Sequence, residues 1–491
     1  MRVMVVDLNN FSHYPTMSVG LIVALLREAG IAVEVLSPLA RGVRGYPRLT
    51  RARPWGLLDE RLRYWSAVTP SRNVRRLRRC AARLLQPGAS EDQATVLAYA
   101  KEMLDRRPDA VLVSTYTMYE QMTAVLGQAC QARGVPMLVG GNYFVAAPIV
   151  ERWLRIDGVS AVYGGEPEAE LVNLVRYLAA GADLSRYPGV SVPGRPAVVP
   201  AAPLQQLDRL PFADYRDFPW HRYRNRIVPL MTGRGCGWGR CRFCADVVTS
   251  AGRSFRSRSL AHVMDELRFQ SERHAASRFV FLDLKLNSNL ELWRGLSAAL
   301  PEVVPGAAWT ASVHVDQHGD HGLEPADLRQ ARRAGLRRIT TGLETASPGL
   351  VKRMAKGTGP ERTADFIRAA AEAGISVRLT TIVGYPGEEP GDVDETARFL
   401  DTHARWIDRV MLNRFVMMLG AEVDRRSVEL PGSLPGLRRG ELDPLNAIVG
   451  HENELWSRPA HRAAVYRLMA AVHRINRKRL GTTALEFEGV M

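Results

Sequence analysis

Short apolar runs and amphipathic segments alternate through the first part of the chain. Residues 18–29 predict an amphipathic helix that ends at Gly30. Buried strands are predicted at residues 2–8, 31–36, 110–114, 136–139 and 159–163. This alternation is typical of a doubly wound parallel sheet, whose ligands bind at the carboxyl ends of the strands. We therefore predict a Rossmann-like α/β domain over residues 1–183, with a basic helical insertion at about 41–108.

A second alternating series follows a stretch rich in proline, glycine and arginine at residues 184–226, which we interpret as a linker. Its predicted strands lie at residues 227–232, 278–284, 309–315, 338–342, 377–383 and 409–413. Each is separated from the next by a helical pattern, so residues 227–420 predict a partial (βα)6 TIM-like barrel. Residues 421–491 change character and predict a small helical C-terminal region.

The composition is that of an average globular protein, with 46% hydrophobic and 24% charged residues among 491. No apolar run approaches the roughly 18 residues that span a bilayer, and the first ten residues lack a secretory signal, so we predict a cytoplasmic protein without a membrane partner. The net charge of +15 comes mainly from arginine. We interpret the basic insertion as a solvated helix face, with a site for an acidic substrate as the alternative. Without a recognisable nucleic-acid module, nucleic acid is not a predicted partner.

Three of the five cysteines form a cluster in the segment TGRGCGWGRCRFCAD. Cys236, Cys241 and Cys244 follow the first predicted barrel strand in a glycine-rich loop. Three thiolates need a fourth ligand to hold zinc, for which His221 or His262 is a candidate, or else they hold an iron–sulfur cluster with one iron free of protein ligands. The carboxyl end of a barrel strand is where barrel active sites lie, which favours a catalytic cluster.

The cysteine segment and its surroundings resemble the radical S-adenosylmethionine (SAM) enzymes, and more narrowly the subgroup with an N-terminal cobalamin-binding domain. The resemblance covers residues 1–420. It implies a 4Fe–4S cluster on Cys236, Cys241 and Cys244, with SAM bound at the open iron. The family's usual spacing is Cys-x3-Cys-x2-Cys, so this chain carries one extra residue between its first two cysteines.

Further segments are similar to the family at matching distances, namely FLDLKLN, ITTGLETASPGLVKRMAKGT and LTTIVGYPGEE. Each alone is equally typical of an ordinary strand end or turn, but their order behind the cysteines favours the joint interpretation. The SAM contacts that the resemblance implies are Phe243, Asp283, Glu344, Ile382 and Gly384.

The N-terminal segments VLVSTYTMYEQM, LVGGNYFVAAP and YGGEPEAEL resemble the cobalamin domain of this subgroup. The implied cobalamin contacts are Gly140, Gly141, Gly164, Gly165 and Glu166. The Asp-x-His-x-x-Gly signature is missing from this domain, so we predict no histidine ligand to cobalt. The missing signature also leaves open a domain without cobalamin.

The resemblance implies an enzyme that methylates an unactivated carbon, or phosphorus, of a natural product or peptide by means of a 5'-deoxyadenosyl radical and methylcobalamin. An electron donor such as flavodoxin or ferredoxin is the implied partner. No catalytic acid or base is assigned, because the cofactors supply the chemistry. The alternatives are a radical rearrangement, cyclisation or oxidation on the same scaffold, with or without cobalamin, and a zinc-bound interaction protein.

Overall fold

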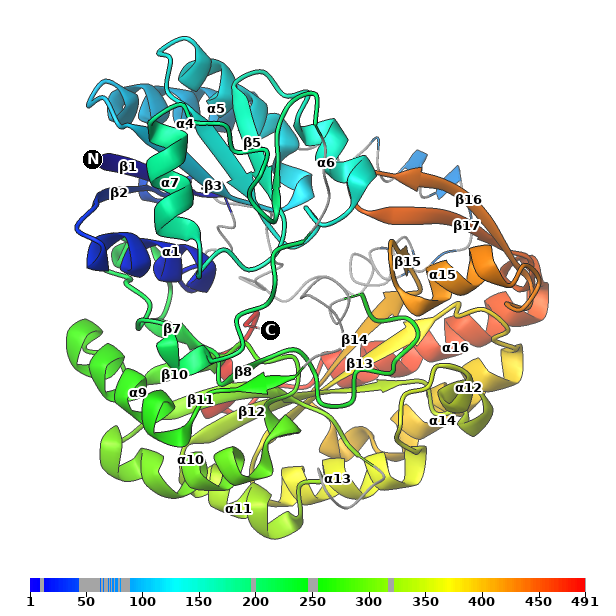
Figure 1. Ribbon diagram of the computed structural model, residues 1–491. Coiled ribbons are helices and arrows are strands. Elements are labelled where there is room, and N and C mark those ends of the chain that lie inside the picture. Colours follow the sequence, from blue (N-terminus) through cyan, green and yellow to red (C-terminus); the bar gives the residue numbers. More distant parts are fainter. Residues whose placement is uncertain are drawn as a thin grey trace.

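The computed structural model describes residues 1–8, 13–43, 89–195, 200–245, 255–316 and 322–490, and positions 62, 65, 69, 71, 73, 74, 76, 77 and 80. Most of the basic insertion therefore lies outside the described residues. Figure 1 shows an N-terminal α/β unit above a larger α/β unit, with a small C-terminal sheet at one side. Of the helices that are described, none combines the length and the apolar character needed to cross a bilayer.

The N-terminal sheet has the strand order β2-β1-β3-β4-β5-β6. Its strands are β1 (Arg2–Asp7), β2 (Ala32–Leu36), β3 (Ala110–Ser114), β4 (Met137–Gly140), β5 (Val159–Tyr163) and the antiparallel edge strand β6 (Val190–Ser191). The other neighbours pair in parallel.

Helices cover both faces of this sheet, which explains why its strands are nearly continuous apolar runs. Val3 and Val5 of β1 pack into the same core as α1 (Met17–Glu28) and α7 (Leu171–Ala179). Met4 and Val6 point to the opposite core, with α4 (Ala89–Leu104), α5 (Glu120–Gln131) and α6 (Ala147–Trp153). The doubly wound domain predicted from the sequence is confirmed.

The second unit is a six-stranded sheet with the order β14-β13-β12-β11-β10-β7, parallel throughout. Its strands are β7 (Ile227–Leu230), β10 (Arg278–Phe281), β11 (Ala308–Val313), β12 (Leu336–Glu344), β13 (Ser376–Val383) and β14 (Arg409–Arg414). The helices between them are α9 (Leu260–His274), α10 (Leu290–Val303), α11 (Pro325–Arg333), α12 (Pro348–Arg353), α13 (Pro360–Glu372) and α14 (Pro390–Thr402). The predicted partial barrel of six βα units is confirmed.

The segment interpreted as a linker is packed between the two sheets. The ring of Tyr215 is fully buried, and its hydroxyl donates a hydrogen bond to the Pro229 carbonyl at 2.9 Å. A Cβ atom on Gly20 of α1 would lie 2.5 Å from this ring, so helix α1 approaches Tyr215 through a glycine. The segment also supplies strand β6, and it therefore acts as part of the interface rather than as a free connection.

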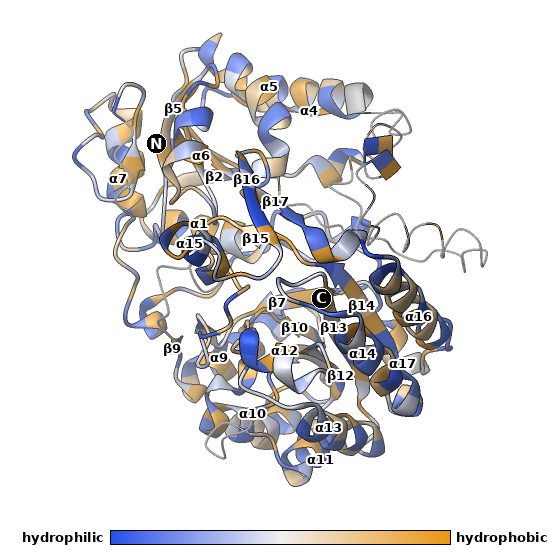
Figure 2. Ribbon diagram, turned by 90° about the vertical axis from the view of Figure 1, so that its right-hand side faces the viewer, coloured by the Kyte–Doolittle hydropathy of each residue, from blue (hydrophilic) through white to orange (hydrophobic). Residues whose placement is uncertain are grey.

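The C-terminal region contains a sheet as well as the predicted helices. Strands β15 (Met417–Met418), β16 (Leu437–Asp443) and β17 (Ile448–Asn453) pair antiparallel beside α15 (Glu422–Glu429), and α16 (Pro459–Asn476) and α17 (Thr482–Leu485) follow. Figure 2 shows that β16 and β17 are mostly hydrophilic. Helix α16 packs on α14, where Arg467 and Arg474 pair with Asp394 at 2.7 Å and Asp401 at 2.6 Å. Two basic side chains of α16 thus pair with acidic side chains of α14.

The segment after α17 enters the barrel from the amino-terminal ends of its strands. Phe487 and Val490 are buried against β7, β10 and β11, on the face that the surrounding helices leave uncovered. Arg278 of β10 holds the Glu486 carboxylate through two hydrogen bonds of 2.8 Å. The buried Arg338 of β12 donates to the Phe487 carbonyl at 3.0 Å. Residues 486–490, which we call the basal plug, therefore fill the end of the barrel opposite the cysteine loop.

Candidate cluster and cofactor site

The cysteine loop leaves the carboxyl end of β7 through the short strand β8 (Gly233–Arg234), which pairs with β9 (Arg256–Ser257). All three cysteines are partly buried. Burial raises the pKa of Cys241 to about 11, with Lys356 acting to lower it and Cys236 to raise it. Lys356 also interacts electrostatically with Cys244. The fold thus holds the three predicted ligands in one loop at this end of the barrel, with a buried cation beside Cys241 and Cys244.

Lys356 is held by the carboxylate of Glu344, one of the predicted SAM contacts. The Nζ atom of Lys356 lies 3.0 Å from Oε1 of Glu344, and the Thr380 hydroxyl donates to the same oxygen at 3.1 Å. Burial opposes the charge of Lys356, but Glu344 and the cysteines outweigh it and raise its pKa above the ordinary value. A Cβ atom on Gly342 would lie 2.1 Å from Oε1 of Glu344, so the pair requires a glycine on β12.

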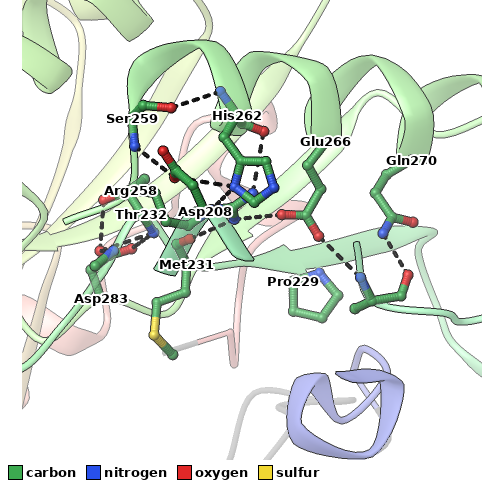
Figure 3. A network of polar contacts seen from close by, with 12 residues as sticks. Asp208, Pro229, Met231, Thr232, Arg258, Ser259, His262, Glu266, Gln270 and Asp283 are labelled. Carbon is green, nitrogen blue, oxygen red and sulfur yellow. Dashed lines mark hydrogen bonds and ion pairs between the residues drawn. The ribbon is translucent and has the colours of Figure 1, made fainter. Parts of the chain in front are cut away.

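Asp283, another predicted SAM contact, joins the end of β10 to the start of the cysteine loop (Figure 3). Its carboxylate accepts hydrogen bonds from the Thr232 hydroxyl at 2.7 Å and from the backbone N–H groups of Thr232 and Gly233, the latter at 2.8 Å. The sequence analysis expected this side chain at the mouth of the barrel, whereas it is 5% exposed and faces the backbone. Burial raises the pKa of Asp283 to about 6. Its contact with SAM stays a prediction.

The remaining predicted SAM contacts lie on an apolar surface near the cysteines. Phe243 and Ile382 pack on the same hydrophobic cluster. Gly384 has φ +87°, and a Cβ atom there would lie 1.7 Å from the indole of Trp456. The expected close approach to Gly384 is therefore occupied by a side chain from the 3-10 helix Glu454–Ser457. Trp456 had no signal in the sequence, because it follows Gly384 by many residues and belongs to no motif.

A buried polar network next to the cysteines was not predicted from the sequence. Lys285 lies 2.7 Å from the Asp316 carboxylate, which in turn lies 2.8 Å from Nδ1 of His314. The Nε2 atom of His314 is 2.9 Å from the Lys356 carbonyl oxygen. Lys285 stands two residues after Asp283 in FLDLKLN. This spacing from a predicted site residue was the sequence signal that could have placed Lys285 at the site. The network ties together the segments that follow β10, β11 and α12, beneath the loop.

Glu166, a predicted cobalamin contact, connects the N-terminal domain to the barrel. Its carboxylate lies 2.6 Å from Arg256 and 2.9 Å from Arg234, and it accepts the Leu204 backbone N–H at 3.0 Å. Arg234, two residues before Cys236, also pairs with Glu168 at 2.6 Å. We call these two acids and two arginines the interdomain ion cluster. It links the end of the Rossmann-like domain directly to the cysteine loop.

The four predicted cobalamin-contact glycines lie at the carboxyl ends of β4 and β5. A Cβ atom on Gly141 would lie 2.1 Å from the Thr115 carbonyl oxygen, and one on Gly164 would lie 2.2 Å from that of Phe144. Gly165 has φ +112° and lies against Ala201, whereas Gly140 would tolerate a side chain, its nearest contact being 3.6 Å. Backbone packing thus requires three of these glycines. Their contact with cobalamin stays a prediction.

The zinc alternative finds no support in the position of His262. Arg258 donates a hydrogen bond to Nδ1 of His262 at 3.0 Å, and the Asp208 carboxylate lies 3.3 Å from the same atom (Figure 3). Within the described parts of the chain, no group of three or more His, Cys, Asp or Glu side chains is placed to hold a single metal ion. In a 4Fe–4S cluster each thiolate binds a different iron, so the ligands need not converge on one point.

Residues 230–400 match the sequence family described as the radical SAM superfamily. This chain carries a radical SAM domain. The domain implies a 4Fe–4S cluster and SAM, and the three partly buried thiols beside a buried cation at its strand ends fit such a cluster in the chemistry of their donors. The cluster loop, the two lysine–carboxylate pairs and the β13 turn at Gly384 all belong to this radical SAM domain.

Similarity to known proteins extends beyond the radical SAM domain. The chain is 27% identical over 321 residues to an uncharacterised methyltransferase of Pyrococcus horikoshii, covering 64% of this chain and 68% of that one. It is 24% identical over 252 residues to bacteriochlorophyllide d C-12(1)-methyltransferase of Chlorobaculum tepidum, covering 51% of each. The chain thus spans about half the length of this second relative.

The solved structure of the radical SAM methyltransferase TsrM from Kitasatospora setae, with cobalamin and a 4Fe–4S cluster bound, superposes with a TM-score of 0.65. The identity is 16%, and the superposition covers 96% of this chain and 89% of TsrM. At this identity the similarity establishes the fold, in which a Rossmann-like domain stands next to a radical SAM domain.

Proposed function

We propose that this protein is a cobalamin-dependent radical SAM methyltransferase. One observation carries the proposal: the cysteine loop lies at the strand ends of the barrel and is joined to the Rossmann-like domain by the buried interdomain ion cluster. TsrM, whose fold is similar, holds both cobalamin and a 4Fe–4S cluster, and the two sequence relatives described above are methyltransferases by name. When bound, the cluster and SAM supply a 5'-deoxyadenosyl radical, and cobalamin supplies a methyl group.

The chain's own residues hold and shield these groups. Cys236, Cys241 and Cys244 are the proposed cluster ligands, and Asp283 fixes the start of their loop. The proposed SAM contacts are Phe243, Asp283, Glu344, Ile382 and Gly384, and residues 1–183 form the proposed cobalamin domain with contacts from Gly140, Gly141, Gly164, Gly165 and Glu166. The basal plug closes the opposite end of the barrel. A reactive radical requires this exclusion of water.

The proposed substrate is a natural product or peptide that is methylated at an unactivated carbon or at phosphorus, and flavodoxin or ferredoxin is the proposed electron donor. A radical rearrangement, cyclisation or oxidation on the same scaffold is the alternative. The two outcomes differ in the fate of the methyl group of SAM, which only a methyltransferase transfers to its product.

Anaerobic reconstitution with iron, sulfide and cobalamin tests the proposal. We expect bound iron, charge-transfer absorption in the visible range, bound cobalamin and reductant-dependent cleavage of SAM. With SAM labelled by deuterium in its methyl group, mass spectrometry should find the label in the methylated product of a candidate substrate. Candidate substrates are taken from the biosynthetic pathway encoded by the neighbouring genes. A protein that binds one zinc and leaves SAM intact would overturn the proposal. Label-free product would instead favour the rearrangement.

A further inference from the structure

The extra residue in the cysteine loop coincides with a tryptophan that is docked into the barrel. Residues 237–240, between Cys236 and Cys241, include Gly239, whose φ of +56° reverses the backbone. The indole of Trp238 stacks on the ring of His314, with the centroids 6.2 Å apart and the planes 16° from parallel. A Cβ atom on Gly357 would lie 2.2 Å from this indole, so Gly357 makes room for it.

The two ends of the loop are held to different parts of the domain. The Gly237 N–H donates to the Ser288 hydroxyl at 3.1 Å, and the Arg242 N–H donates to the Met354 carbonyl at 3.0 Å. Trp238 lies between these anchors, and its Nε1–H donates to the Ala355 carbonyl at 2.9 Å. The guanidinium of Arg240 lies 5.4 Å from the indole centroid. The added length is therefore fixed in place by the indole.

The indole has a single N–H, and this group is donated to the Ala355 carbonyl. With the Arg242–Met354 bond, it makes a second hydrogen bond from the cysteine loop to the segment just before Lys356. The loop is therefore docked on the segment that carries the buried cation beside the cysteines.

We propose that Trp238 is a positioning residue for the cluster: its indole anchors the lengthened loop between His314 and Gly357, and its N–H bonds the loop to the Ala355 carbonyl. The inference rests on the proposed cluster site. It explains how a loop with four residues between the first two cysteines holds the ligands that a loop with three holds in related enzymes.

The test compares anaerobically reconstituted full-length Trp238→Phe and Trp238→Ala with wild type. Trp238→Phe keeps an aromatic ring on His314 and lacks only the N–H that bonds to the Ala355 carbonyl, so we expect normal iron content and an EPR spectrum of the reduced cluster like that of wild type. Trp238→Ala also removes the anchor, and we expect iron loss to a chelator to rise by about 10- to 100-fold, the usual cost of removing a residue that supports metal ligands. Trp238→Phe should retain iron as wild type does.

Trp220→Ala is the matched control, because Nε1 of Trp220 also donates to a backbone carbonyl, that of Tyr215 at 2.9 Å, and its ring lies 4.9 Å from that of His274. It is remote from the cysteines in sequence and contacts, so its rate of iron loss should equal that of wild type. Gly357→Ala provides a second route, since its Cβ must displace the indole. Wild-type rates of iron loss in both Trp238→Ala and Gly357→Ala refute the inference, whereas a wild type without a cluster refutes the proposed function instead.

Discussion

Replacing Glu166 by glutamine removes the charge on which the interdomain ion cluster depends. The side chains of Glu166 and Arg256 are 12% and 6% exposed, and both oxygens of Glu166 are engaged, by Arg256 at 2.6 and 2.8 Å and by Arg234 at 2.9 Å. After the substitution Arg234 retains Glu168, but Arg256 loses the carboxylate that it pairs with among the described residues and keeps the Leu204 carbonyl at 2.6 Å and the neutral amide oxygen of the glutamine. Removing one partner of a buried ion pair costs about 3–5 kcal/mol, so we expect a loss of this order.

The loss of stability should be measurable in the protein without bound cofactors. Hydrogen exchange followed by mass spectrometry should show faster exchange in the peptides around β8 and β9, and thermal unfolding should begin at a lower temperature. Burial opposes the charge of Glu166, but the arginines outweigh it and hold its pKa below the ordinary 4.5. The stabilisation is therefore present at neutral pH, and it should be lost as the pH falls through this depressed pKa.

Glu120→Gln is the control, because its partner Arg152 is 45% exposed and such surface pairs contribute about 0–1 kcal/mol. If Glu166→Gln weakens cobalamin binding and leaves the unliganded protein as stable as Glu120→Gln does, the ion-cluster reasoning is refuted. Glu166 would then act only as the cofactor contact that the sequence predicted.

Three further predictions concern the radical SAM domain. Cys236→Ala should abolish SAM cleavage and reduce bound iron, whereas Cys130→Ala, far from the loop, should leave both unchanged, as measured by iron analysis and chromatography. Asp283→Asn should flatten the pH dependence of stability: the pKa of this acid is raised from 3.8 to about 6 on folding, so wild type loses about 3 kcal/mol as the pH rises through that interval. Thermal unfolding between these pH values measures it, and parallel curves for the two proteins would contradict the assignment. Gly384→Ala should strain a left-handed backbone and displace Trp456, lowering stability by about 1–3 kcal/mol and shifting the tryptophan fluorescence; an unchanged spectrum would show that the indole does not contact this position.

The parallel strands and the cysteine loop could be predicted because their signals are local. Strands such as β7 and β11 are short runs rich in apolar residues and bounded by turn residues, and the cysteines lie within nine consecutive residues. Strand β16, by contrast, has the sequence LRRGELD and is mostly exposed, so it carries no alternating apolar pattern that would reveal it. Such a segment forms a strand because it pairs with a neighbouring strand, and not because its own residues favour one.

The buried polar groups of the site could not be predicted, because their burial is decided by residues distant in sequence. Lys356 stands in the segment KRMAKGTG, which is typical of a solvated helix end. Only the fold places it 3.0 Å from Glu344 and beside the cysteines. In the same way Trp456 fills the space at Gly384, and Glu166 pairs with the barrel rather than pointing to open solvent.

The basal plug imposes an order on folding. Arg338 forms its hydrogen bond with Phe487 across 149 positions, and Asn225 bonds to the Glu486 carbonyl across 261. While the chain is being synthesised, the strand arginines have no carboxylate from the plug, and a buried guanidinium without a partner is strongly unfavourable. The strands can therefore pack permanently only after residues 486–490 have left the ribosome. The N-terminal domain can mature during translation, whereas completion of the barrel must wait until residues 486–490 have been synthesised.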